Sequence, residues 1–79
     1  MPYVTANFDK AVDAVELAAG HGIVASKGEA RRLIQQGGLY VNDRRVTPET
    51  IAIATDELLA GRYVIMRKGA RSRTLIEFV

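Results

Sequence analysis

The chain has 79 residues, of which 48% are apolar and 25% are charged, and its formal net charge is +2. This length and composition are typical of one small globular domain, and the absence of cysteine excludes disulfides, zinc–thiolate sites and cysteine nucleophiles. Because the sequence has neither an apolar run of about 18 residues nor the pattern of a signal peptide, we expect a cytoplasmic protein with no membrane partner.

The N-terminal part predicts a lead-in followed by a helix. Residues 1–8 show no clear period, so we expect a lead-in without regular structure there and place the domain at residues 9–79. A first helix is predicted from about Asp9 to Ala19, with Asn7 or Asp9 as its N-cap, because apolar residues recur on one face of this segment.

Residues 26–46 predict a capped helix followed at once by a hairpin. Ser26 and Glu29 have the spacing of a capping box, and apolar residues follow at helical spacing. Gly37-Gly38 ends this helix, because glycine adopts the left-handed cap conformation without a Cβ clash. Asn42-Asp43 then predicts a tight reversal between two short strands.

The C-terminal part predicts a second hairpin. Asp56 can cap a single helical turn over residues 57–60. The run Tyr63–Met66 and the run Thr74–Val79 alternate as strands do, and a basic loop over residues 68–73 joins them.

The charges fall into four blocks along the chain. Residues 1–25 carry a net charge of −2, residues 26–46 carry +3, residues 47–61 carry −3 and residues 62–79 carry +4. If the two basic blocks meet in space, they form a positive patch that can bind phosphate backbones. The alternative is an ordinary solvated surface of mixed charge.

The residues needed for catalysis are hard to find in this sequence. Loops that cradle nucleotide phosphates are absent, and His21 is the only histidine, so it lacks the partners of a metal site or a catalytic triad. We therefore expect a binding module and not an enzyme, with no cofactor, no metal and no small-molecule substrate.

The basic residues suit a folded RNA better than a sequence-specific DNA site. A basic helix, a basic hairpin arm and a basic loop can surround one phosphate path, which is typical of shape recognition of RNA. Arginine outnumbers lysine eight to three, which favours bidentate phosphate contacts. Tyr40 and Tyr63 could stack on bases, with core packing as the alternative for Tyr63. The candidate contacts are Lys27, Arg31, Arg32, Arg44, Arg45, Lys68 and Arg71.

Two runs of residues resemble known families. Residues 26–42, S-K-x-E-A-R-R-L-I-x-x-G-G-x-x-V-N, resemble the S4 RNA-binding motif, which is named for a ribosomal protein. Residues 56–69, D-x-L-L-x-G-x-Y-V-I-x-R-x-G, with L-I-x-F at residues 75–78, are similar to the C-terminal domain of bacterial-type tyrosyl-tRNA synthetases. The resemblance implies an α+β fold, a small S4-like (αL-type) domain with two main helices packed on a small, mostly antiparallel sheet.

The same resemblance implies a function. Such a domain grips tRNA-Tyr at its variable arm or anticodon-side region, for a tyrosine–tRNA ligase whose catalytic domain is not in this chain and forms the homodimer. Two positions depart from the family pattern. The family turn often has Asn-Gly where this chain has Asn42-Asp43, and it commonly has Lys-Lys where this chain has Ala70-Arg71, which puts a phosphate contact at position 70 in doubt.

Two other functions remain open at this point. One is a stand-alone S4 protein associated with the ribosome or its RNA. The other is a protein–protein docking module that presents Tyr63, Met66 and Phe78 on an exposed sheet face. Three more arginines follow in the sequence: Arg62, Arg67 and Arg73. Each either faces RNA or pairs with an acid among Asp56, Glu57 and Glu77, and we expect some of them to form such pairs.

Overall fold

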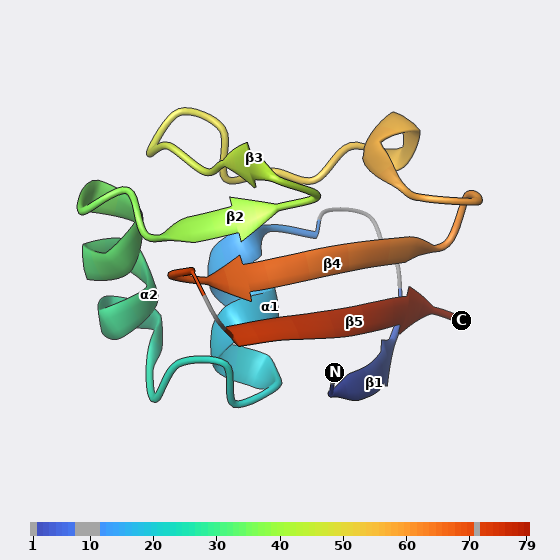
Figure 1. Ribbon diagram of the computed structural model, residues 1–79, viewed down its shortest axis with the longest axis horizontal. Helices are drawn as coiled ribbons and strands as arrows, with labels where there is room; N and C mark the ends of the chain where they lie inside the picture. Colours follow the sequence, from blue (N-terminus) through green and yellow to red (C-terminus); the bar gives the residue numbers. More distant parts are fainter. Residues whose placement is uncertain (1, 8–11, 71) are drawn as a thin grey trace.

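The computed structural model describes residues 2–7, 12–70 and 72–79. In chain order, its elements are β1 (Tyr3–Ala6), α1 (Ala14–Gly20), α2 (Lys27–Gln35), β2 (Leu39–Val41), β3 (Arg44–Arg45), a 3₁₀ helix (Thr55–Glu57), β4 (Tyr63–Lys68) and β5 (Ser72–Phe78). Figure 1 shows the strands as one sheet, with α1 behind β4 and β5 and with α2 beside the end of the sheet.

The five strands lie in the order β1-β5-β4-β2-β3. Neighbouring strands are antiparallel except β1, which runs parallel to β5. The predicted fold class is therefore confirmed: it is α+β, with two helices packed on a small, mostly antiparallel sheet.

The two faces of the sheet differ because strand side chains alternate between them. One face packs against the helices and contributes six residues to the buried core: Leu39, Val41, Val64, Met66, Ile76 and Phe78. We call the other side the open face, since no described helix covers it. Its residues, assigned from the alternation and the strand register, are Tyr3, Thr5, Tyr40, Arg45, Tyr63, Ile65, Arg67, Arg73, Leu75 and Glu77.

Helix α2 has the predicted boundaries. The Ser26 hydroxyl accepts a hydrogen bond of 3.1 Å from the N–H of Glu29, which caps the helix start. Gly37 follows the helix with a φ of +74°, a backbone conformation that glycine adopts readily. A Cβ at Gly38 would lie 2.6 Å from Leu33 Cδ1, so the end of that side chain would have to shift.

The turn between β2 and β3 is fixed by its own backbone and by one amide. Asn42 and Asp43 both have positive φ, which is the pattern of a type I′ hairpin turn. The Asn42 Nδ2 donates to the Glu57 carbonyl at 2.6 Å, and its Oδ1 accepts from the Ile65 N–H at 2.9 Å. The predicted tight reversal is confirmed, and its amide side chain joins the turn to β4 and to the 3₁₀ helix.

The expectations for the N-terminal part need correction. The predicted lead-in is wrong for Tyr3–Ala6, which forms β1 through long-range pairing with β5. The helix starts at Ala14 and not near Asp9, because Asp13 is the N-cap and accepts from the Glu16 N–H at 2.7 Å. Asp9 itself lies outside the described residues.

Three expectations for the C-terminal part are also wrong. The basic loop over residues 68–73 is shorter than predicted, because Lys68 belongs to β4, while Ser72 and Arg73 belong to β5. The single turn is a 3₁₀ helix at Thr55–Glu57, displaced from the predicted 57–60. The docking face fails as well, since its proposed members Met66 and Phe78 are buried against the helices, opposite to Tyr63.

We predict that Asn42→Ala lowers the free energy of unfolding by about 2 kcal/mol more than Asp43→Ala, since two hydrogen bonds are lost at about 1 kcal/mol each. Asp43→Ala is the matched control, because both residues have positive φ. Urea denaturation followed by circular dichroism measures both variants. Equal losses would show that the Asn42 amide does not hold the turn in place.

Candidate nucleic-acid interface

The outer side of α2 carries two adjacent arginines. Arg31 and Arg32 are exposed, whereas Ala30 and Ile34 of the same helix are buried in the core. Neither arginine has an ion-pair partner among the described residues. Their charges are therefore free to meet an anionic ligand, on a helix whose position is fixed by its buried side.

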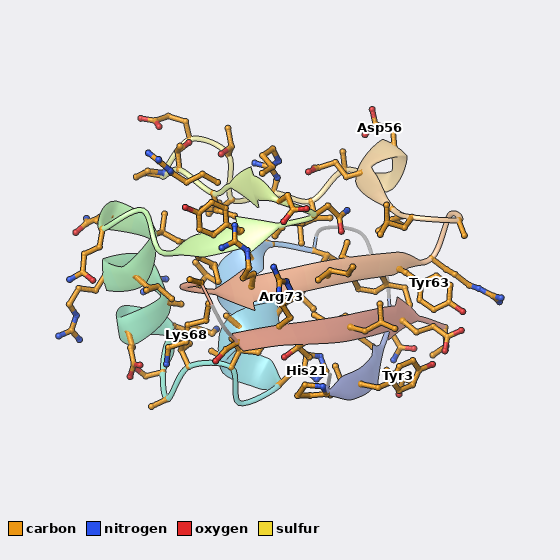
Figure 2. The ribbon with its side chains drawn as sticks, viewed as in Figure 1. Tyr3, His21, Asp56, Tyr63, Lys68 and Arg73 are labelled. Carbon is orange, nitrogen blue, oxygen red and sulfur yellow. The ribbon has the colours of Figure 1, made fainter. Side chains whose placement is uncertain are left out.

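Two lysines, one at the start of this helix and one beside it, form weak ion pairs. Lys27 lies 2.8 Å from the Glu16 carboxylate of α1, and both side chains are more than half exposed. Lys68, at the end of β4, lies 3.9 Å from the Glu29 carboxylate, and Figure 2 shows it between β4 and α2. Exposed pairs of this kind contribute about 0–1 kcal/mol, so either lysine can exchange its carboxylate for a phosphate at little cost.

Arg45 extends the basic surface beyond the end of α2. It is exposed on β3, and its side chain passes over Gly37, with Cδ 3.5 Å from where a Cβ on that glycine would lie. The short helix cap therefore brings the hairpin arm next to the helix. Five of the seven predicted contacts lie on or beside α2, namely Lys27, Arg31, Arg32, Arg45 and Lys68, whereas Arg71 lies outside the described residues.

Arg44 is held within the protein by an ion pair and by hydrogen bonds. Its Nη2 and Nε lie 2.7 and 2.8 Å from one carboxylate oxygen of Glu57, and its Nη1 donates to the Thr50 carbonyl at 3.2 Å. The second oxygen of Glu57 accepts from the Ala54 N–H at 2.9 Å. Arg44 stays a prediction as an RNA contact, but its guanidinium is already engaged with the protein.

The expectation that some of the remaining arginines pair with acids is confirmed for Arg62, which lies 3.8 Å from Glu77. Arg67 lies 3.8 Å from Asp43 instead and donates to the Gly69 carbonyl at 2.8 Å. Arg73 is exposed and has no ion-pair partner among residues 2–7, 12–70 and 72–79.

One contact escaped the sequence analysis. The Arg67 guanidinium lies 3.8 Å from the centre of the Tyr40 ring, at the distance of a cation–π contact. The two residues are cross-strand partners on β2 and β4. The alternation of each strand indicates which face a residue occupies, but the register that sets these two side by side is not visible in the sequence.

Metal ligands, the single histidine and long apolar helices were the other features considered in the sequence. Within them, no group of three or more His, Cys, Asp or Glu side chains is placed to hold a metal ion. His21 is the C-cap of α1, where its N–H donates to the Leu17 carbonyl at 3.1 Å. In the part of the chain that the structure describes, no helix is long and apolar enough to cross a membrane.

With this geometry in place, comparison with known proteins is decisive. The family model of the tyrosine–tRNA ligase SYY-like C-terminal domain matches residues 1–76. The chain belongs to this family. The match includes β1, so the strand that the sequence analysis missed lies within the family domain.

Curated relatives of this C-terminal domain are whole ligases. The tyrosine–tRNA ligase of Opitutus terrae is 46% identical over 65 residues, and that of Streptomyces coelicolor is 43% identical over 63 residues. These alignments cover 82% and 80% of this chain but only 15% of each ligase.

A solved structure agrees with the family assignment. The solution structure of a tyrosyl-tRNA synthetase C-terminal domain matches with a TM-score of 0.75 and 31% identity, over 98% of this chain and 78% of that one. The predicted resemblance to the synthetase C-terminal domain is confirmed.

We predict that Arg44→Ala lowers the free energy of unfolding by about 1–2 kcal/mol, the size of a partly buried, charge-assisted hydrogen-bond network. Arg45→Ala, the neighbouring arginine of β3, is the matched control and should change stability by less than about 0.5 kcal/mol. Both values come from urea denaturation curves. A stability loss in Arg45→Ala as large as that in Arg44→Ala would contradict the division of roles.

Proposed function

We propose that this chain is a tRNA-binding domain that holds tRNA-Tyr for a tyrosine–tRNA ligase. The observation that carries the proposal is the pair of adjacent arginines on α2, Arg31 and Arg32, which are exposed and without acidic partners in the described part of the chain. Membership of the ligase C-terminal family supports tRNA as the RNA that is held.

The surface around α2 suits a folded RNA. Arg31 and Arg32 lie on the helix, Lys27 at its first turn, Lys68 beside it and Arg45 at its end. These positive charges come from three separate elements, so they can follow a curved phosphate path, as in the recognition of RNA by shape. Arg71 extends the proposed surface as a sequence prediction.

This surface binds RNA without performing chemistry on it. In the proposed division of labour, the domain grips the variable arm or anticodon-side region of tRNA-Tyr, and the catalytic domain of the ligase activates tyrosine. The ligase would act in the cytoplasm as a homodimer formed through its catalytic domain. Binding energy gained far from the reacting ends serves to orient the tRNA.

We predict that the double variant Arg31→Ala, Arg32→Ala binds a tRNA-Tyr transcript at least about ten-fold more weakly. Its plot of log affinity against log salt should be shallower by about 1.4–1.8, because each lost phosphate contact removes about 0.7–0.9 from the slope. Fluorescence anisotropy titrations at several salt concentrations measure both quantities.

Arg62→Ala is the control, since Arg62 is also an exposed arginine but pairs with Glu77. Its affinity and salt slope should match those of the unchanged protein. An unaltered slope in the double variant would exclude α2 as the contact surface. Equal affinity for tRNA-Tyr and for a ribosomal RNA hairpin would contradict the tRNA assignment while leaving RNA binding in place.

A further inference from the structure

The open face of the sheet collects all the tyrosines of the protein. The chain has three tyrosines, and the strand register places Tyr3, Tyr40 and Tyr63 on this face. Exposed aromatic rings on a sheet are a common platform on which unpaired bases stack. No described helix covers the face; Tyr3 is exposed, and Tyr40 and Tyr63 are half-buried.

One transverse row on this face combines an aromatic ring with three arginines. Tyr40 pairs with Arg45 on β3 and with Arg67 on β4, and Arg67 in turn pairs with Arg73 on β5. Directly paired residues point to the same side of a sheet. The row therefore crosses four strands, over three strand spacings or about 14 Å. We call it the arginine–tyrosine row.

The centre of this row is held in a fixed geometry. The Arg67 guanidinium lies 3.8 Å from the centre of the Tyr40 ring and is anchored by its bond to the Gly69 carbonyl. The side chain keeps 18% of its surface exposed, and its buried Nε has no hydrogen-bond partner. The nearest acid is Asp43, at 3.8 Å, whose side chain is 86% exposed. A preformed ring–guanidinium stack of this kind lowers the entropy cost of adding a base.

The two ends of the row carry exposed positive charge. Arg45 and Arg73 have no ion-pair partner among the described residues. Figure 2 shows Arg73 nearer to α2 than Tyr63 is, with Tyr63 and Tyr3 toward the other end of the sheet. At that other end Glu77 pairs with Arg62 and accepts from the Tyr3 hydroxyl, so the opposite end is not free to attract anions.

We propose that the arginine–tyrosine row binds a short unpaired RNA segment that continues from the structured RNA held by α2. A base of that segment stacks on the Tyr40–Arg67 pair, and its phosphates contact Arg45 and Arg73. This inference rests on the proposed function, because Arg45 is also the residue whose side chain lies against the end of α2 and makes the two surfaces continuous.

The chemistry favours RNA over a protein segment as the occupant. A row with three guanidinium groups and one loosely held acid complements a polyanion, and every base offers a π-face to the central stack whatever its sequence. The face is therefore suited to hold an unpaired strand without reading its sequence.

The test compares two probes: an RNA hairpin with a blunt stem, and the same hairpin with a short unpaired 3′ extension of uridines. We expect the unchanged protein to bind the extended hairpin about ten-fold more tightly, the ratio that one stacked base provides. Tyr40→Leu and Arg73→Ala should each bring this ratio close to one and leave binding of the blunt hairpin largely intact. Tyr40→Phe should keep the ratio, since it retains the ring.

Tyr63→Leu is the matched control, because it removes a tyrosine from the same face at the opposite end, and its ratio should stay unchanged. Thermal melts confirm that each variant is folded, and Arg73→Ala alters only an exposed side chain. The proposal is overturned if the unchanged protein binds both hairpins equally, or if Tyr63→Leu lowers the ratio as much as Tyr40→Leu does. A different result would show that α2 does not bind RNA: the double variant Arg31→Ala, Arg32→Ala would bind the blunt hairpin as tightly as the unchanged protein. That result can be told apart from a failure of the arginine–tyrosine row, which changes only the ratio between the two hairpins.

Discussion

The Asn42 amide joins the turn between β2 and β3 to the 3₁₀ helix and adds a side-chain bond to the backbone pairing with β4. It donates to the 3₁₀ helix at Glu57 and accepts from β4 at Ile65, while its positive φ forms the turn between β2 and β3. Arg44 strengthens the same junction through the Glu57 carboxylate. Because these groups are partly buried, leaving one unpaired costs more than the bond itself contributes. The position of the hairpin arm, and with it that of Arg45, depends on this junction.

The ion pairs of the domain divide its positive charges into two classes. Arg44 and Arg62 have carboxylate partners, at 2.7 Å from Glu57 and 3.8 Å from Glu77 respectively. Arg31, Arg32 and Arg73 have none in the described residues and lie on surfaces exposed to solvent. The net charge of +2 does not reveal this division, because it sums acids and bases wherever they lie. On the surface, the unpaired arginines still produce local positive potential.

The features that the sequence predicts correctly are local. The cap at Ser26 and the turn signal of Asn42-Asp43 can be recognised from residues that lie three or fewer positions apart, and the alternation of β4 can be recognised from neighbours. The features that it misses join distant residues: β1 pairs with the last strand, and Arg44 meets Glu57 thirteen positions away. The candidate contacts on α2 could be grouped from the sequence because a helix is local, whereas the stack of Arg67 on Tyr40 depends on a register that only the folded sheet provides.

The outer strand β3 has a second consequence. It forms one edge of the sheet and consists of two residues, both arginine. An uncovered edge offers free N–H and C=O groups to the strand of another molecule, and short, charged edges discourage such pairing. The short length of β3 and the exposed charge of Arg45 therefore disfavour strand-to-strand self-association, whereas the charge of Arg44 is paired with Glu57. Neutral replacements in this strand would affect solubility at high concentration, even where the fold of the single molecule persists.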